Sequence, residues 1–431
     1  MLMRSLFLPS VFIVSSFLAV PAVAANGLIH VPATHSTIQA AIDAATANDT
    51  IVVAAGSYAG FTVGNTTATP LSIVGDPSAG AVTVTGAMIL TNTTRVNLRR
   101  INAVRGGAAP CLTLDGATAI WVEECDYETT PAPGDCSPTP SATVTLLNGS
   151  DLNMVRCTVD PYDGYLLGPQ DSCGGSEAVE SFNSTFGAWE CDLRGGRARP
   201  NLVDQESVLV YGTTGYSAIY AFEASGPDAF EDVFLSGTAL RAGDGADAAV
   251  EPCAPGTAGG YVVTLDGAQM TEIGFTADST LFHAGIPGMM VWPTCPGGTN
   301  PSTWVALLNG ATESYLTGVP RNLTTPPITT SGSTMSFTFE GQVGEAYALQ
   351  IGTPWPSFYF PPTLGIIALN WQTSTTILSG TIPAGGLAGN SLTAPSIGSL
   401  QAQSVFLQAA FATSGGVYHL SPPSSPVILA P

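Results

Sequence analysis

The sequence contains no lysine, and its 11 basic residues are all arginine. A chain without lysine cannot form a lysine Schiff base, use a P-loop lysine or employ a lysine general base. Acidic residues number 32, so the formal net charge is −21. Because nucleic acids and anionic membrane surfaces repel such a chain, we expect no nucleic-acid partner.

Charged residues of both signs are also scarce, at 10% of the chain, whereas glycine (48) and proline (33) are abundant. This composition favours short strands with frequent turns over long amphipathic helices. The chain starts with Met1–Arg4 and the apolar stretch Leu6–Val20, followed by Ala22-Val23-Ala24, the small-x-small pattern of a signal-peptidase site. We predict a signal peptide over residues 1–25, no membrane span in the mature chain, and a secreted protein, extracellular or at the cell surface.

One helix is predicted near the start of the mature chain. Ser36 and Gln39 form a capping box, in which Ser36 accepts a hydrogen bond from the Gln39 amide. An apolar face then recurs at helical spacing, at Ile38, Ala41, Ile42 and Ala45. We expect this helix to cover the first coil of a β-solenoid, whose apolar interior and unpaired backbone would otherwise be exposed.

Short alternating strands recur after this helix. Four of them run into Asp-Gly or Asn-Gly, a pair that tolerates positive φ and turns the chain sharply: Leu112–Ala117, Val144–Ser150, Val263–Ala268 and Val305–Ala311. The spacing between repeats is irregular, so insertions must loop out of the coils. The richest insertions are Asp126–Pro140, Asp160–Gly175 and Gly243–Gly260, and loops on a rigid scaffold are where function usually lies.

The segments Thr37–Asp43, Asn48–Val53 and Gly56–Tyr58 together resemble the opening of the pectin-lyase-like right-handed β-helix proteins. Beyond them the resemblance continues only as a repeat pattern, to about Gly318. It implies a right-handed parallel β-helix with an N-terminal capping helix over residues 26–318. Asn48 stands where the family usually has glycine, a change that a tight turn tolerates. The matched residues cap and turn the coil, so they imply architecture and no catalysis.

The amino-acid composition of the chain changes after Pro320. We predict a Thr- and Pro-rich linker over residues 319–332 and a small antiparallel β-sandwich over residues 333–431, with strands such as Met335–Phe339 and Val405–Ala410. This segment resembles the small C-terminal β-domain often appended to secreted bacterial β-helix proteins. The predicted fold class is therefore all-β, a right-handed parallel β-helix followed by a β-sandwich.

Eight cysteines in a secreted chain indicate disulfides rather than a redox or zinc site, and no Cys-x-x-Cys occurs. Three of them recur at matching offsets, which leaves two alternatives: a stack of buried small residues inside the coil, or disulfides between coils or to loop cysteines. The pairing cannot be derived from spacing. The disulfide candidates are Cys111, Cys125, Cys136, Cys157, Cys173, Cys191, Cys253 and Cys295.

A polysaccharide hydrolase would need paired acids, and a uronate lyase would need a base with calcium or arginine to neutralise the uronate. The motifs of polygalacturonase-type hydrolysis, Asn-Thr-Asp, Asp-Asp, Gly-His-Gly and Arg-Ile-Lys, are all absent. The catalytic candidates are Glu190, Asp192, Arg194, Arg197 and Arg199, and the alternative is that these arginines pair with acids on neighbouring coils. Calcium is the one cofactor considered, at Asp244, Asp247 and Glu251, although their spacing matches no recognised calcium loop.

Aromatic residues between prolines form the remaining candidate site. Trp355, Phe358 and Tyr359 predict a rigid loop on which sugar faces could stack, and the alternative is that these rings pack the sandwich or dock it on the end of the β-helix. Because architecture accounts for most of the sequence pattern, we expect a secreted non-catalytic β-helix scaffold or surface/adhesion protein. The alternatives are a polysaccharide-active enzyme, uronate lyase before hydrolase, and a carbohydrate-binding protein. The partner would be an extracellular polysaccharide or a cell-surface component.

Overall fold

The structure is a computed structural model that describes residues 27–431 apart from 68, 108, 131–140, 167–171, 174, 199–201, 204–208, 211–214, 224–231, 247–256, 274–281, 288–297, 299–300, 302–303, 317–319 and 360–362. For a few residues in strands, among them Phe358 and Tyr359, only the backbone is described. The predicted signal peptide lies outside the described residues. No helix in the described part of the chain is both long and apolar enough to cross a membrane.

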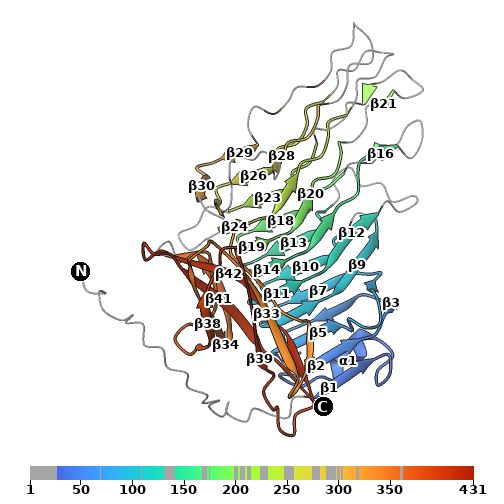
Figure 1. The fold of residues 1–431 in the computed structure, drawn as a ribbon. Coiled ribbons are helices and arrows are strands. Elements are labelled where there is room, and N and C mark those ends of the chain that lie inside the picture. Colours follow the sequence, from blue (N-terminus) through green and yellow to red (C-terminus); the bar gives the residue numbers. More distant parts are fainter. Residues whose placement is uncertain are drawn as a thin grey trace.

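The part of the chain from Leu28 to Leu316 forms a parallel β-helix with three sheets (Figure 1). Each complete coil gives one strand to sheet A, then one to sheet B, then one to sheet C, and β1 and β30 extend sheet A at its two ends, so the sheets have 10, 8 and 8 strands. Successive coils pair in parallel register, as where Ile120 faces Leu152 in sheet A. The predicted all-β fold is confirmed.

Strand lengths of two to six residues follow from the short alternating runs of the sequence. Sheet A contains β1 (Leu28–Val31), β2 (Thr50–Val53), β5 (Leu71–Gly75), β8 (Val96–Arg99), β11 (Ile120–Glu123), β14 (Asp151–Val155), β19 (Thr185–Trp189), β24 (Asp232–Ser236), β27 (Gln269–Ile273) and β30 (Thr312–Leu316). Sheet B contains β3 (Gly56–Tyr58), β6 (Val82–Val84), β9 (Ile101–Gly106), β12 (Asp126–Thr130), β15 (Thr158–Asp160), β20 (Asp192–Arg194), β25 (Ala239–Arg241) and β28 (Phe282–His283). Sheet C contains β4 (Phe61–Val63), β7 (Met88–Thr91), β10 (Leu112–Asp115), β13 (Val144–Leu147), β18 (Val179–Phe182), β23 (Ile219–Phe222), β26 (Val263–Asp266) and β29 (Val305–Leu308).

The inside of the coil is a continuous apolar core made of columns, one residue per coil. One such column in sheet C runs through Leu112, Val144, Val179 and Ile219, which pair in register and are all fully buried. Burial of a side chain of this size contributes roughly 1.5–3 kcal/mol, so each coil is held mainly by the coils above and below it.

Two of the three turns repeat a residue with positive φ in coil after coil. At the turn from sheet C to sheet A, these residues include Asn92, Asn148, Asn183, Gly267 and Asn309. Asparagine and glycine adopt this conformation at low cost, so the predicted turn role of the Asp-Gly and Asn-Gly repeats is confirmed. At the turn from sheet A to sheet B, the equivalent residues are Arg100, Glu124, Arg156, Glu190 and Gly237.

Helix α1 (Ile38–Ala44) covers the N-terminal end of the coil, as predicted. Its N-cap is Thr37 rather than Ser36, because the Thr37 side chain accepts from the Ala40 amide at 3.1 Å. The expected capping box is therefore wrong by one residue. Gln39 instead bonds the backbone of Thr62 in both directions, at 2.7 and 3.2 Å. Ile38, Ala41 and Ile42 are buried, which confirms the apolar face.

The predicted insertions fall between a strand of sheet B and the next strand of sheet C, at the third turn. The insertion Asp160–Gly175 contains a hairpin of β16 (Tyr165–Leu166) and β17 (Ser172–Cys173). A second hairpin, β21 (Leu202–Val203) with β22 (Leu209–Val210), follows β20 at a position where no insertion was predicted. Where the insertions leave the coil, glycine-rich segments bond to one another through backbone groups. Gly243 donates to the Tyr216 carbonyl and accepts from the Gly260 amide, both at 2.9 Å. A Cβ on Gly243 would lie 1.7 Å from the Gly196 carbonyl oxygen, so only glycine fits.

The C-terminal domain consists of small, mostly antiparallel sheets around a second core. The prediction of a linker over residues 319–332 needs correction. This segment contains two strands that pair with later strands of the domain, so it is part of the domain rather than a free connector. The strands are β31 (Asn322–Thr324), β32 (Ile328–Thr330), β33 (Thr334–Glu340), β34 (Ala346–Gly352), β35 (Pro354–Tyr359), β36 (Thr363–Leu364), β37 (Ile366–Leu369), β38 (Thr375–Thr381), β39 (Leu387–Thr393), β40 (Ala402–Ser404), β41 (Phe406–Ala412), β42 (Tyr418–Ser424) and β43 (Val427–Leu429).

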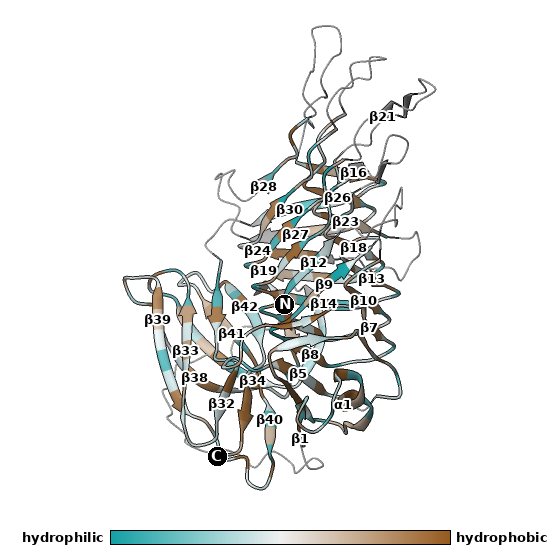
Figure 2. Cartoon of the chain, turned by 90° about the vertical axis from the view of Figure 1, so that its right-hand side faces the viewer, coloured by the Kyte–Doolittle hydropathy of each residue, from teal (hydrophilic) through white to brown (hydrophobic). Residues whose placement is uncertain are grey.

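This domain packs against the outer face of sheet A, beside the N-terminal half of the β-helix (Figures 1 and 2). Three small apolar clusters join the two parts. They combine Val74 with Ala402 and Val427; Trp121 with Ala368 and Leu369; and Val155, Trp189 and Phe234 with Ile366. The outer face of sheet A in these coils is therefore buried rather than open to a ligand.

The cysteines that the structure describes with their side chains are buried and free, which corrects the disulfide prediction for Cys111, Cys125, Cys157 and Cys191. Cys125, Cys157 and Cys191 form the predicted alternative, a stack inside the coil in which the Cys157 amide donates to Sγ of Cys191 at 3.4 Å. Burial raises the pKa of the Cys157 thiol well above its ordinary value, so it stays protonated. The side chains of Cys136, Cys173, Cys253 and Cys295 lie outside the described part.

Candidate functional site

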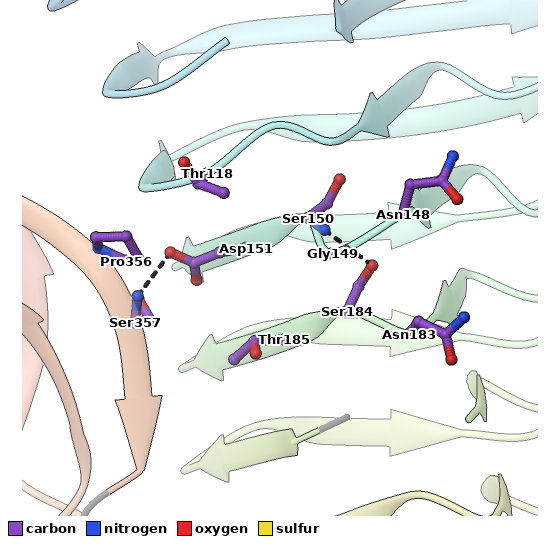
Figure 3. Close-up of a pocket in the computed structure, with 10 residues that line it drawn as sticks. All are labelled: Thr118, Asn148, Gly149, Ser150, Asp151, Asn183, Ser184, Thr185, Pro356 and Ser357. Carbon is purple, nitrogen blue, oxygen red and sulfur yellow. Dashed lines mark hydrogen bonds between the residues drawn. The ribbon is translucent and has the colours of Figure 1, made fainter. Parts of the chain in front are cut away.

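A pocket lies where the turn from sheet C to sheet A meets the C-terminal domain (Figure 3). Its volume is about 470 Å³, within the range of roughly 300–1,000 Å³ that is usual for small-molecule sites. The β-helix side is formed by Thr118, Asn148–Asp151 and Asn183–Thr185, and the domain side by Pro356 and Ser357 of β35. Amides, hydroxyls and one carboxylate therefore line it.

Asp151 is the one charged residue among those that line the pocket, and only 4% of its surface is exposed. Its Oδ2 accepts from the Ser357 amide at 2.7 Å and from the Ala119 amide at 3.0 Å. Its Oδ1 lies 3.5 Å from Nδ2 of Asn153, a separation at which a hydrogen bond is weak. Burial raises the pKa of Asp151 to about 6, although the hydrogen bonds from Ser357 and Ala119 oppose this rise.

The floor of the pocket is a rigid ladder of turn residues. The Ser150 amide donates to Oγ of Ser184 at 3.1 Å, and Oγ of Ser150 donates to the Leu147 carbonyl at 2.6 Å. Asn148 and Asn183 follow β13 and β18, which pair in register, so the two amides stack in adjacent coils. Asn148 also donates to Asp115 of the preceding coil at 2.6 Å. This wall is preorganised by the coil itself.

A buried ion network lies a few residues further along the same strands, at the turn from sheet A to sheet B. Arg99 and Glu123 are buried and 3.3 Å apart, and Arg99 also contacts Glu124 at 2.6 Å. Arg156 pairs with Glu123 as well. Arg99, the Glu123–Glu124 pair and Arg156 thus lie on three successive coils. The attraction of the neighbouring arginines, Arg99 first, lowers the pKa of Glu124 despite burial.

The C-terminal domain supplies the remaining partners of this network. Arg99 donates to the Thr325 carbonyl at 2.9 Å, and Ser424 donates to the Glu123 carboxylate at 3.0 Å. These bonds are structural, because they join two domains and leave Glu123 little contact with solvent, at 2% exposure.

The predicted catalytic residues do not all share one site: Arg194 and Arg197 meet at Asp163, whereas Glu190 and Asp192 pair with other arginines. Glu190 lies 3.8 Å from Arg156 at the turn from sheet A to sheet B, and Asp192 lies 3.4 Å from Arg241. Arg194 binds Asp163 at 2.6 and 2.8 Å and Asp160 at 3.0 Å, and Arg197 lies 3.5 Å from Asp163. Arg199 lies outside the described residues. The alternative prediction, that these arginines pair with acids on other coils, fits this arrangement.

The calcium and aromatic candidates are only partly described. Asp244 accepts from the Ile286 amide at 2.9 Å and lies 3.8 Å from Arg197, while Asp247 and Glu251 fall outside the described residues. Within the described residues, no group of three or more His, Cys, Asp or Glu is placed to hold a metal ion. Trp355 is 46% exposed on β35, directly before the pocket residue Pro356.

Sequence reasoning missed the pocket. It treated Val144–Ser150 as a turn motif and assigned no role to Asp151 or Ser357. A signal was present, because Asp151 follows a predicted turn and begins a strand whose register partner in the preceding coil is Ala119. The two flanking coils hold Ala119 and Thr185 at this position, so Asp151 is an acid between two uncharged residues.

No family model and no curated protein matches this chain. A solved structure titled superoxide reductase (neelaredoxin), from Ignicoccus hospitalis, is 8% identical with a TM-score of 0.17, covering 26% of this chain and 80% of that chain. A tailspike protein mutant of E. coli bacteriophage HK620 in complex with pentasaccharide is 10% identical with a TM-score of 0.19, covering 80% of this chain and 79% of that chain. At these TM-scores neither likeness supports an argument about fold or function.

Proposed function

We propose that this protein is a secreted, non-catalytic β-helix scaffold of surface or adhesion type. The observation that supports it most is the pairing of charges. Every described member of the predicted catalytic set has an oppositely charged partner within 4 Å on another coil: Glu190, Asp192, Arg194 and Arg197. A lyase would need an uncommitted base beside a group that neutralises a uronate.

The number of acids in the pocket lining supports a protein without glycosidase activity. A glycoside hydrolase requires two carboxyl groups, about 5–9.5 Å apart, facing one sugar. Asp151 is the single acid among the residues that line this pocket. A second candidate function, carbohydrate binding without turnover, is favoured by the hydroxyl and amide side chains among the lining residues.

The test is to incubate the secreted mature protein with neutral and uronate polysaccharides, with calcium and with a chelator. We expect neither the ultraviolet absorbance of unsaturated lyase products nor new reducing ends. Product on any polymer that disappears in both Arg194→Ala and Arg197→Ala would overturn the proposal in favour of a lyase. N-terminal sequencing tests export separately, and we expect the mature chain to begin near Ala25 or Asn26.

A further inference from the structure

The junction pocket has features that a purely structural contact would not need. An interface built only to dock two domains is expected to pack its polar groups against one another, as the Arg99–Glu123 network does. Here a space of about 470 Å³ stays open between them and is lined by hydroxyls and amides. A pocket at a domain interface is a common location for small-molecule sites.

The chemistry of the lining selects the ligand. The side chains of Asn183 and Thr185 carry both donors and acceptors, the groups that complement a polyol, whereas Asn148 contributes its amide oxygen because its Nδ2 donates to Asp115. Oδ1 of Asp151 accepts from no backbone amide, because both backbone N–H bonds go to Oδ2, and its partner is the weak contact from Nδ2 of Asn153 at 3.5 Å. A buried carboxylate that accepts from two hydroxyls is a strong and directional partner for a sugar.

Charge excludes other ligands. The one charged lining residue is an acid in a chain of net charge −21, so a uronate or phosphate would be repelled. No described aromatic ring lines the pocket, so it lacks the cage typical of quaternary ammonium recognition. An uncharged polyhydroxylated ligand remains.

We propose that the pocket between the Asn148–Asp151 turn and Ser357 binds a neutral sugar unit of an extracellular glycan, with Asp151 and the stacked Asn148 and Asn183 as its polar contacts. The ligand contacts both domains, so it stabilises the docked arrangement. This inference rests on the proposed function, because a surface protein that performs no turnover can still attach through a glycan.

Thr185 offers a specific test with a matched control. Thr185 lines the pocket, and Thr312 occupies the same column of sheet A three strands further along, where it is exposed and away from the pocket. Thr185→Phe should fill the pocket, whereas Thr312→Phe adds the same ring elsewhere. Urea unfolding of both variants checks that each is folded.

The probes are the methyl glycosides of glucose, galactose, mannose, glucosamine and glucuronic acid, each tested by saturation-transfer NMR and titration at neutral pH. We expect at least one neutral glycoside to bind, its affinity to fall at least ~10-fold in Thr185→Phe, and Thr312→Phe to match the unchanged protein. Ten-fold corresponds to about 1.4 kcal/mol. Absence of binding, equal binding by Thr185→Phe, or preference for the glucuronide or glucosaminide would each overturn the inference.

The inference and the proposed function fail separately. Product release from a polymer, with neutral-sugar binding still lost in Thr185→Phe, would refute only the non-catalytic scaffold. No product and no neutral-sugar binding would leave the scaffold and refute the pocket.

Discussion

Glu123→Gln should loosen the C-terminal domain, because Glu123 is the acid shared by the two domains. The substitution keeps the shape of the side chain and removes its charge. Glu123 is 2% exposed, lies 3.3 Å from Arg99, pairs with Arg156 and accepts from Ser424 at 3.0 Å. Its loss leaves the Arg99 guanidinium, which is fully buried, with one carboxylate fewer.

The expected magnitude follows from burial. Removing one partner of a buried ion pair typically costs ~3–5 kcal/mol, because the remaining charge stays out of water. Arg99 keeps Glu124 at 2.6 Å and the Thr325 carbonyl at 2.9 Å, so we expect the lower end, ~3 kcal/mol. The loss should appear as an earlier first transition in urea, since the domain can detach before the coils unfold.

The matched control is Asp160→Asn, which removes one acid from an exposed pair. The Asp160 side chain is 45% exposed, and its partner Arg194 keeps Asp163. Exposed pairs contribute about 0.2–1 kcal/mol, so this variant should unfold almost as the original protein does. The reasoning is refuted if the two variants lose equal stability, or if hydrogen exchange in β42 is unchanged by Glu123→Gln.

Three further predictions concern the helix cap, the glycine-rich turn and pH. Thr37→Ala should cost about 1 kcal/mol in urea unfolding, whereas Ser36→Ala should cost almost nothing, and the reverse order would restore the capping box. Gly243→Ala should prevent accumulation of folded protein, because its Cβ would overlap a carbonyl oxygen, whereas Gly64→Ala, which meets nothing within 4 Å, should fold normally. The pKa of Asp151 is raised to about 6 in the folded protein, above its value in the unfolded chain. Between these two pKa values the folded protein binds more protons than the unfolded chain, so lowering the pH through this window increases the free energy of unfolding, by on the order of 3 kcal/mol in total. Relative to Asp151→Asn, the original protein should therefore gain unfolding free energy between about pH 7 and about pH 4, and a constant difference would contradict the burial of this carboxyl.

The coil could be predicted because its signals are local. Strand β13 and its turn at Asn148 lie within one short run, where alternation and a residue that tolerates positive φ agree. The same locality explains the one-residue error at α1, because Ser36 and Thr37 both have capping side chains. Which one caps depends on how Ile38 and Ile42 meet the coil, a tertiary contact.

The candidate site could not be predicted because its contacts are distant in sequence. Asp151 meets Ser357 across 206 residues, and Glu123 meets Ser424 across 301. No periodicity links such pairs, and the Thr- and Pro-rich composition of residues 319–332 predicted a linker where β31 and β32 form. The arginine cluster was predicted as one site because its residues are close in sequence. In the structure, the Arg194 partners Asp160 and Asp163 come from another coil.

The ion network also accounts for how the domain finds its place along sheet A. Parallel coils repeat about every 4.8 Å, so an apolar face alone would fit almost equally well one coil higher or lower. The polar contacts are not repetitive, because Arg99, Glu123 and Val155 follow one another in a single column. A shift by one coil would put the Thr325 carbonyl, which now accepts from Arg99, against the Glu123 carboxylate, and two acceptors repel each other. The same shift would leave the Ser424 hydroxyl facing Val155 without an acceptor, an added cost of about 1–3 kcal/mol for a buried donor. Buried charges here therefore fix the register of docking, and that register aligns Ser357 with Asp151 at the pocket.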